Sequence, residues 1–313
     1  MSIVHLDTGN GSGGDGGDSD EALVTALRHR AAEALERAYG FLEAGDDVWA
    51  FLRAQVLCGA RPASELSDRL AATQQTDGRM AVGTLLSGGG LGFPATDPAS
   101  LTEAQRGMIG CLEALLIAGD AKILHSSWVE PAVRFLESQQ AEDGAFRMGS
   151  TESGDVQSEL FWTGMIAGIL GRTPVSRLVT LEAAGRYLSA RFDPEMVEHD
   201  GYSALIGYAH FYTNVADDLA DEALQWCGRA LEKGFRSRHM EAVAAVRVLL
   251  TCDAQAMPGA TFDVAELLER LLDEQAGDGG FAELCLDGPA GRTTQTVDAM
   301  MGIVRLCAAL DES

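Results

Sequence analysis

Lysine is almost absent from this chain, which contains only Lys122 and Lys233. Its 313 residues include 23 basic and 47 acidic ones, so the formal net charge is -24 at pH 7. A strongly negative field repels nucleic acid and anionic membrane surfaces. We therefore expect no nucleic-acid partner.

Long apolar runs are also missing. The longest, residues 161–171, is well short of the roughly 18 residues that cross a bilayer. The first twenty residues contain no basic start followed by an apolar run, so we expect no export signal and a cytoplasmic location. Residues 1–20, rich in glycine, serine and aspartate, are expected to form a disordered tail, and residues 21–313 a single domain.

The six cysteines show no Cys-x-x-Cys spacing. Most of them lie in apolar helical patterns, where a free thiol behaves as a small apolar group. We interpret them as reduced residues of the core. The sequence therefore predicts no metal site and no cofactor.

Strand patterns are nearly absent, because no run of Val, Ile, Thr and aromatic residues alternates with period two. Helical patterns fill the chain instead. Residues 21–42 carry one apolar stripe, as a surface helix does, whereas residues 48–58 are apolar nearly all round. This alternation of outer and inner helices continues through six pairs. The other pairs are predicted at residues 63–75 and 102–118, 127–140 and 157–170, 176–192 and 202–212, 217–233 and 239–251, and 263–275 and 294–310.

Three of the turns inside these pairs share nearly one sequence. They read Gln74-Gln75-Thr76-Asp77-Gly78, Gln140-Ala141-Glu142-Asp143-Gly144 and Gln275-Ala276-Gly277-Asp278-Gly279. The last two continue to an aromatic residue, at Phe146 and Phe281, which we expect to fill the gap between neighbouring hairpins. Glycine permits a positive φ, while Asp and Gln side chains satisfy polar groups at helix ends. The repetition indicates that one structural unit has been copied.

This Gln-x-x-Asp-Gly-x-aromatic repeat, at the junction of outer and inner helices, resembles that of squalene and terpenoid cyclases and of the protein prenyltransferase β-subunit. The resemblance extends over about residues 21–310, and three short motifs carry it. It implies an all-α fold, an α/α toroid in which six helical hairpins close into inner and outer rings.

The catalytic signatures of those families are missing from the positions that would carry them. The Asp-x-Asp-Asp motif of class II terpene cyclases does not occur. Residues 200–202 and 295–297 lack the Cys and His that would bind zinc in a prenyltransferase, so the resemblance implies neither zinc nor protein prenylation. Residues 217–221 match the Asp-Asp-x-x-Asp motif of class I terpene synthases, but we interpret them as the acidic first turn of an outer helix.

Candidate site residues come from the inner helices, mainly from their first turns. In a toroid these turns meet at one rim and direct the positive ends of their dipoles at a shared cavity. The candidates for acid/base catalysis are His199, Asp200, Tyr202, His239, Glu241 and Asp298. The candidates for substrate binding are Trp49, Glu159, Trp162, Tyr208, Arg236, Arg238, Arg292 and Gln295.

Two of these candidates leave alternatives open. Residues 236–241 either anchor a phosphate or carboxylate or form a solvated rim paired with acids. A buried Asp298 needs a partner or a raised pKa. It is therefore either a catalytic acid or a tie between two hairpins.

Three functions fit these observations. The first is a biosynthetic enzyme that performs a metal-independent acid/base cyclisation or isomerisation of a small-molecule substrate in a central cavity. The second is a cyclase or modifying enzyme that acts on a ribosomal peptide and needs an elongated groove. The third is a non-catalytic binding or scaffold toroid with an exposed apolar patch. For the enzymes, the glycine-rich residues 83–100 are a predicted lid.

Overall fold

The computed structural model describes residues 16–82, 100–148, 155–198, 202–253, 257–261, 263–281 and 289–312. Within these residues the chain forms thirteen helices and no strand, which confirms the all-α prediction. Residues 1–15 of the predicted tail and residues 83–99 of the predicted lid lie outside the described residues.

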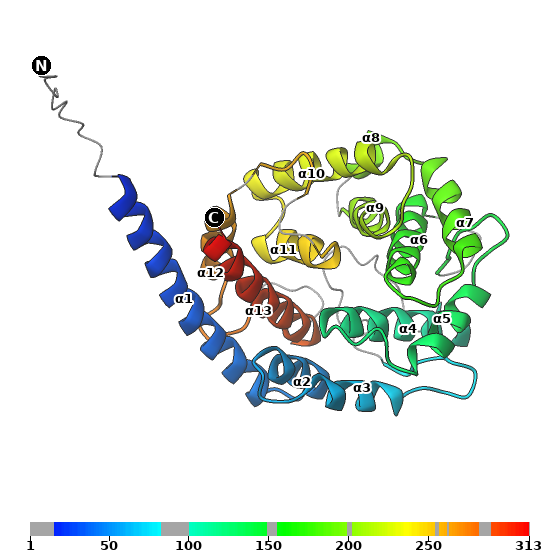
Figure 1. Ribbon diagram of the computed structural model, residues 1–313, viewed down its shortest axis with the longest axis horizontal. Coiled ribbons are helices and arrows are strands. Elements are labelled where there is room, and N and C mark those ends of the chain that lie inside the picture. Colours follow the sequence, from blue (N-terminus) through cyan, green and yellow to red (C-terminus); the bar gives the residue numbers. More distant parts are fainter. Residues whose placement is uncertain are drawn as a thin grey trace, which may run out of the picture.

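Each predicted helical segment overlaps one of the helices. In Figure 1 six helices lie along the outside of the molecule: α1 (Gly16–Ala44), α3 (Ala63–Ala71), α5 (Val129–Ser138), α7 (Leu178–Ser189), α10 (Ala220–Arg236) and α12 (Val264–Asp273). Their partners, called the inner helices below, are α2 (Val48–Leu57), α4 (Glu103–Asp120), α6 (Val156–Gly171), α9 (Ser203–Asn214), α11 (Ala242–Thr251) and α13 (Pro289–Glu312).

Two details differ from the predictions. The first helix begins at Gly16, five residues before the expected start, and the additional residues include no proline that would stop a helix. Residues 16–20 of the expected tail therefore belong to this helix. A short helix, α8 (Pro194–Val197), was not predicted; Asp193 caps it and Pro194 occupies its first turn.

The glutamine of each repeated turn joins that turn to the next outer helix. Nε2 of Gln140 donates to the carbonyl oxygen of Gly144 at 3.0 Å and to that of Thr180, in α7, at 2.9 Å. The same pair of bonds joins Gln74 to Gly78 and Trp128, and Gln275 to Gly279 and Ala34. One side-chain amide thus sets the position of each of these turns against its neighbour.

The glycine of each repeated turn has a positive φ and lies against the same outer helix. At Gly144 φ is +94°, and a Cβ added there would lie 2.2 Å from the carbonyl oxygen of Ala183, one turn after Thr180. Gly78 and Gly279 have φ of +91° and +92° and similar contacts with Pro131 and Arg37. No other residue type fits both the backbone conformation and the contact.

The residues after the glycine fasten the turn to the inner helix that follows. Phe146 and Phe281 are fully buried, as predicted for aromatic residues that fill the gap between hairpins. The backbone N–H of each donates at 3.0 Å to a threonine hydroxyl, that of Thr163 in α6 or that of Thr296 in α13. The aromatic residue therefore both packs and aligns the inner helix.

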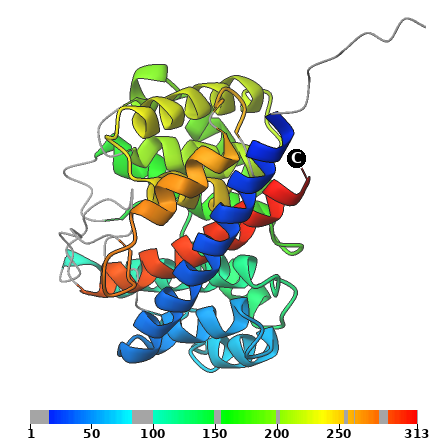
Figure 2. The ribbon, with the colours of Figure 1, turned by 90° about the vertical axis from the view of Figure 1, so that its left-hand side faces the viewer.

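The inner helices contact one another in a defined order. Going round, α2 contacts α13, then α13 contacts α11, α11 contacts α9, α9 contacts α6, and α6 contacts α4. The first outer helix, α1, packs against α12 and α13, so elements from the two ends of the chain lie side by side (Figure 2). The third repeated turn, through Gln275 and Ala34, holds this junction.

The contact between α6 and α9 depends on glycine. A Cβ on Gly164 would lie 2.1 Å from the carbonyl oxygen of Gly207, and one on Gly168 would lie 2.4 Å from Cδ2 of His210. The two backbones therefore approach more closely than side chains allow. This contact places His210 in the interior.

The turn geometry predicts the effect of a small substitution. Gly144→Ala should destabilise the protein by at least about 2 kcal/mol, because it combines an unfavourable φ with a clash against α7. Gly277→Ala is the matched control, since an added Cβ there meets no atom within 4 Å; it should change stability by less than about 0.5 kcal/mol. Urea unfolding measures both changes in stability. Equal effects would contradict the close contact between Gly144 and α7.

Candidate functional site

Four charged side chains from four inner helices meet in the interior. Arg53 of α2 donates from Nη2 to Oδ2 of Asp120 in α4 at 3.2 Å and to Oδ1 of Asp298 in α13 at 3.5 Å. Arg247 of α11 donates from Nη1 to Oδ1 of Asp298 at 3.0 Å and lies 3.8 Å from Oδ2 of Asp120. We call these four residues the interior ion cluster.

The interior ion cluster is shielded from solvent but not sealed. Its side chains are between 7% and 15% exposed. Burial raises the pKa of Asp298, although the charges of Arg247 and Arg53 act in the opposite direction. Burial therefore favours the protonated form of Asp298. The Arg53–Asp120 pair also joins α2 to α4.

A fully buried histidine lies near this cluster. His210 of α9 is 0% exposed, and neither of its ring nitrogens has a hydrogen-bond partner among the described residues. Burial lowers its pKa to about 3, and the charges of Arg172 and Arg247 act in the same direction. The imidazole is therefore neutral at pH 7.

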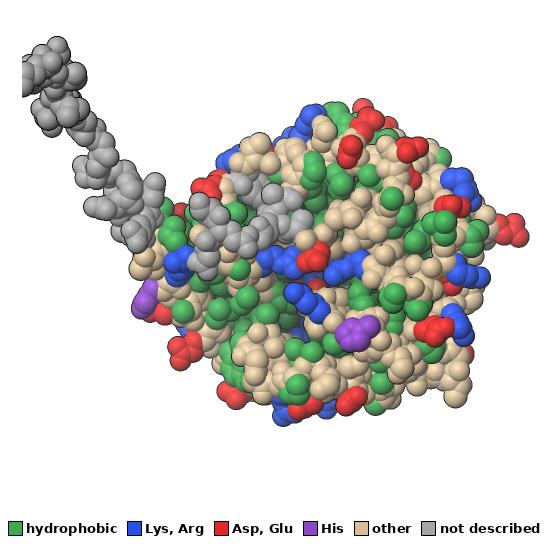
Figure 3. All heavy atoms as spheres, in the orientation of Figure 1, with side chains coloured by type: hydrophobic (Ala, Val, Ile, Leu, Met, Phe, Trp, Pro, Cys, Tyr) green, Lys and Arg blue, Asp and Glu red, His purple; other side chains and the backbone are tan. Residues whose placement is uncertain are grey.

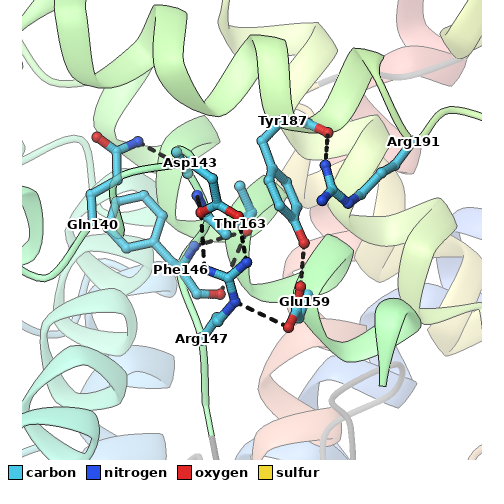
Figure 4. Close-up of polar contacts among 10 residues, drawn as sticks. Gln140, Asp143, Phe146, Arg147, Glu159, Thr163, Tyr187 and Arg191 are labelled. Atoms are coloured by element: carbon cyan, nitrogen blue, oxygen red, sulfur yellow. Dashed lines mark hydrogen bonds and ion pairs between the residues drawn. The ribbon is translucent and has the colours of Figure 1, made fainter. Parts of the chain in front are cut away.

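The candidate Glu159 lies in a different network (Figure 4). Its carboxylate accepts a hydrogen bond from the hydroxyl of Tyr187 in α7 and another, of 3.1 Å, from Nε of Arg147. Arg147 also pairs with Asp143 of the repeated turn, and the guanidinium of Arg191 lies 3.8 Å from the centre of the Tyr187 ring. Burial and the Glu159 carboxylate raise the pKa of Tyr187 to about 12. These contacts bind the repeated turn to α6 and α7.

The aromatic candidates mostly belong to the core. Trp162 is 2% exposed and packs edge-on against Phe161. Tyr208 is fully buried, and its hydroxyl donates to the carbonyl oxygen of Arg191 at 2.9 Å. Trp49 is half-buried at the start of α2. Packing between helices explains the burial of the first two.

The basic candidates of residues 236–241 are exposed. Arg236 ends α10 and does not start α11; it pairs with Glu232 at 2.7 Å and with Glu266 at 3.1 Å. Arg238 and His239 lie exposed in the turn that follows. Arg236 is therefore paired with acids, which is one of the two alternatives given for residues 236–241.

The candidate Glu241 is exposed at the N-terminal end of α11 and makes no capping hydrogen bond there. The carboxylate of Glu274, which follows α12, accepts hydrogen bonds from the N–H groups of Ala242 and Val243 at 2.6 and 3.0 Å instead. Burial raises the pKa of Glu274. A carboxylate does cap this helix, but it comes from the neighbouring hairpin.

The candidates at the start of α13 belong to the repeated turn. Arg292 forms two bonds of 2.9 and 2.8 Å with the carboxylate of Asp278, and its guanidinium lies over the ring of Phe41. Gln295 is buried, at 4% exposed. The bidentate pair holds Arg292 at the turn.

Tyr202 precedes α9 with a φ of +58°. Its hydroxyl lies against α10, where a Cβ on Gly234 would come within 2.7 Å of it. His199 and Asp200 lie outside the described residues. The structure thus brings one sequence-predicted catalytic candidate, Asp298, into the interior ion cluster.

The sequence analysis missed the partners of Asp298, although a signal for two of them exists. Arg53 and Arg247 are the only charged residues of α2 and α11, two otherwise apolar helices. A lone charge in a helix that is covered on every side must find a buried partner. Both residues lie in the middle of their helices, outside the first turns that supplied most of the candidates.

A groove of about 580 Å³ lies on the outer side of the molecule, between α7 and the connection from α9 to α10. Apolar side chains such as Leu178 and Phe211 line it together with acidic ones, among them Asp217 and Asp218. Beside it Val175, Leu178 and Val179 are 40%, 68% and 61% exposed. The predicted acidic first turn thus borders an exposed apolar patch.

On the face of the molecule in Figure 3, several Lys and Arg side chains gather across the middle, with an acidic side chain among them, and side chains of both charges lie around the edge. Within the described ranges no group of three or more His, Cys, Asp or Glu side chains is placed to hold a metal ion. None of the described helices has the length and apolar character that a membrane span requires.

Comparison with known proteins found no family model, no curated protein and no solved structure that matches this chain.

The buried imidazole predicts acid sensitivity. The pKa of His210 is lower in the folded protein than its usual 6.5, so its contribution to stability is complete above that pH and is lost as the pH falls towards 3. Between pH 7 and pH 5 the wild type should lose about 2 kcal/mol more stability than His210→Phe. Urea unfolding at both pH values measures this difference.

The control for that prediction is His239→Phe, which replaces an exposed ring. It should leave the pH dependence of stability unchanged. If His210→Phe also left the pH dependence unchanged, the assignment of His210 as a buried, neutral imidazole would be wrong.

Proposed function

We propose that the six helical hairpins close into an α/α toroid of the terpenoid cyclase and protein prenyltransferase type. Two observations support this arrangement. The three repeated turns share one geometry, and the last of them fastens its hairpin to α1. The inner helices also contact one another in sequence from α2 through α13 to α4, and the Arg53–Asp120 pair joins the remaining two.

We further propose that the protein is a biosynthetic enzyme that cyclises or isomerises a small molecule held between the inner helices. One observation carries this proposal: Asp298 has a raised pKa and lies within reach of two guanidinium groups in a nearly closed interior. A carboxyl group of this kind is suited to general acid catalysis.

The proposed reaction begins with transfer of the Asp298 proton to a carbon or heteroatom of the substrate. Arg53 and Arg247 then stabilise the carboxylate that remains, because both already donate to its oxygen. The substrate gives up one proton at the end of the reaction, and one proton returns to Asp298. Substrate and product therefore have equal mass.

The Asp298 assignment predicts the outcome of an isotope experiment. A metabolite extract in D₂O is incubated with the protein, and mass spectrometry follows compounds that change retention time while their formula changes only by exchange of hydrogen for deuterium. Transfer of the Asp298 deuteron to a substrate carbon leaves one non-exchangeable deuterium in the product. Asp298→Asn should reduce its formation by about 100-fold or more, because a positioned general acid contributes that much.

Asp120→Asn is the matched control, since it removes the other carboxylate of the same cluster. The catalytic role requires conversion to be lost far more in Asp298→Asn than in Asp120→Asn, with thermal unfolding confirming that both fold. Equal losses would instead assign Asp298 a structural role as a tie between hairpins.

The groove beside α7 favours a second candidate function, recognition of a peptide. Its apolar lining and its three carboxylates, which outnumber the single arginine, Arg186, fit a segment that carries apolar and basic side chains. The carboxylates are those of Glu182, Asp217 and Asp218. A ribosomal peptide substrate and a protein partner of a scaffold both present such segments. The interior ion cluster plays no part in this function.

Peptide recognition predicts selective binding. A labelled 14-residue peptide with leucines on one helical face and arginines elsewhere should bind the protein at least tenfold more tightly than its glutamate counterpart. Leu178→Ser should weaken this binding, whereas Leu23→Ser, which alters a leucine that is 51% exposed on α1, should not. Equal binding by both variants would attribute the affinity to net charge alone.

A further inference from the structure

The guanidinium group of Arg172 has no partner among the described residues. Arg172 follows α6 as its C-cap residue, and it forms no ion pair and no side-chain hydrogen bond with the described residues. Its side chain lies flat against Gly119 of α4, where an added Cβ would approach three guanidinium atoms to 3.3–3.4 Å. Glycine at position 119 therefore makes room for this arginine. The donors at the edge of the guanidinium are left free.

His210 also lacks hydrogen-bond partners, as described above, and it is fully buried. The charges that act on its ring are those of Arg172, from α6, and Arg247, from α11. Both are positive. The neighbourhood of the imidazole thus combines an unsatisfied ring with two guanidinium groups. Arg247 is paired with Asp298 and Asp120, whereas Arg172 has no partner among the described residues, and an anion beside it would supply one.

Arg247 retains donors for such an anion. Its ion pairs with Asp298 and Asp120 both run through Nη1. Guanidinium groups bind carboxylate and phosphate oxygens through two parallel N–H groups, and this geometry suits Arg more than Lys.

We propose that Arg172 and Arg247 bind an oxyanion, a carboxylate or phosphate group of a ligand, beside His210 near the C-terminal ends of α4 and α6. This inference deepens the proposed function and rests on it only in identifying the ligand as the substrate. The substrate is then an anionic metabolite. Its charged group lies beside the interior ion cluster, and the reacting part of the molecule faces Asp298.

Inorganic phosphate and succinate are suitable probes, because they separate the two oxyanion sources. Either one, at roughly ten times its dissociation constant, should raise the midpoint of thermal unfolding by about 2 to 4 °C relative to chloride of equal ionic strength. The anion that gives the larger rise identifies the group. No rise with either would overturn the proposal.

Arg172→Gln should weaken binding of the effective probe by about tenfold or more, because it removes a charge-assisted bidentate contact. The matched control is Arg305→Gln, which removes an arginine paired with Asp253 at the surface. Equal weakening in both variants would overturn the proposal in favour of a general charge effect.

A measurement on the wild type keeps the test independent of any variant. The ring signals of His210, assigned by their loss in His210→Phe, are followed by NMR against pH with and without the probe. A bound oxyanion offsets the two neighbouring positive charges and should raise the pKa of His210. An unchanged titration would overturn the proposal.

The two proposals fail separately. If the probe binds at Arg172 but the isotope assay detects no conversion, the oxyanion site is supported and the catalytic function is contradicted. Conversion that depends on Asp298, without probe binding, would leave the enzyme and remove the oxyanion site.

Discussion

The side-chain amide of Gln140 has two hydrogens, and the structure uses both. One bonds to the turn that contains the glutamine, and the other bonds to the next outer helix. Because Gln74 and Gln275 repeat this geometry, a glutamine side chain positions each of three hairpins against its neighbour. The glycine of each turn is equally constrained, since a Cβ would collide with a carbonyl group of that outer helix. The arrangement of helices around the interior depends on these contacts.

The position of the hairpins decides which side chains meet in the interior. Arg53, Asp120, Arg247 and Asp298 come from four helices and form one ion cluster there. Such a cluster is poor evidence for a contribution to stability, because taking charges out of water costs about as much as their attraction returns. Apolar residues of similar size would serve the fold at least as well. The cost favours a role for the cluster in binding or chemistry.

The surroundings of His210 differ in charge from the chain as a whole. Acidic residues outnumber basic ones two to one in the whole chain, yet the charges that act on buried His210 are both positive. The outside suits a basic partner, and the groove beside α7 adds apolar contacts for one. The interior ion cluster balances two arginines with two aspartates, whereas Arg172 has no partner among the described residues, so the surroundings of His210 suit an anion. These two environments are compatible with a single protein that receives a small anionic molecule inside and a peptide outside.

The sequence by itself determined the helices and the repeated turns. Helical periodicity and the Gln-x-x-Asp-Gly motif are local properties, so the positions of the twelve long helices, the positive φ of Gly144 and the burial of Phe146 and Phe281 all followed from them. For the site, the sequence singled out Asp298 but not its partners. Arg236 and Glu241 appeared as suitable for the site as Asp298, because a sequence shows that a charge lies near a helix end but does not show which neighbour the charge faces. Only the tertiary structure decided that Arg247 meets Asp298, that Glu274 caps α11, and that the guanidinium of Arg172 lies against Gly119. These contacts join residues far apart in the chain, and the packing of the helices alone sets the distances between them.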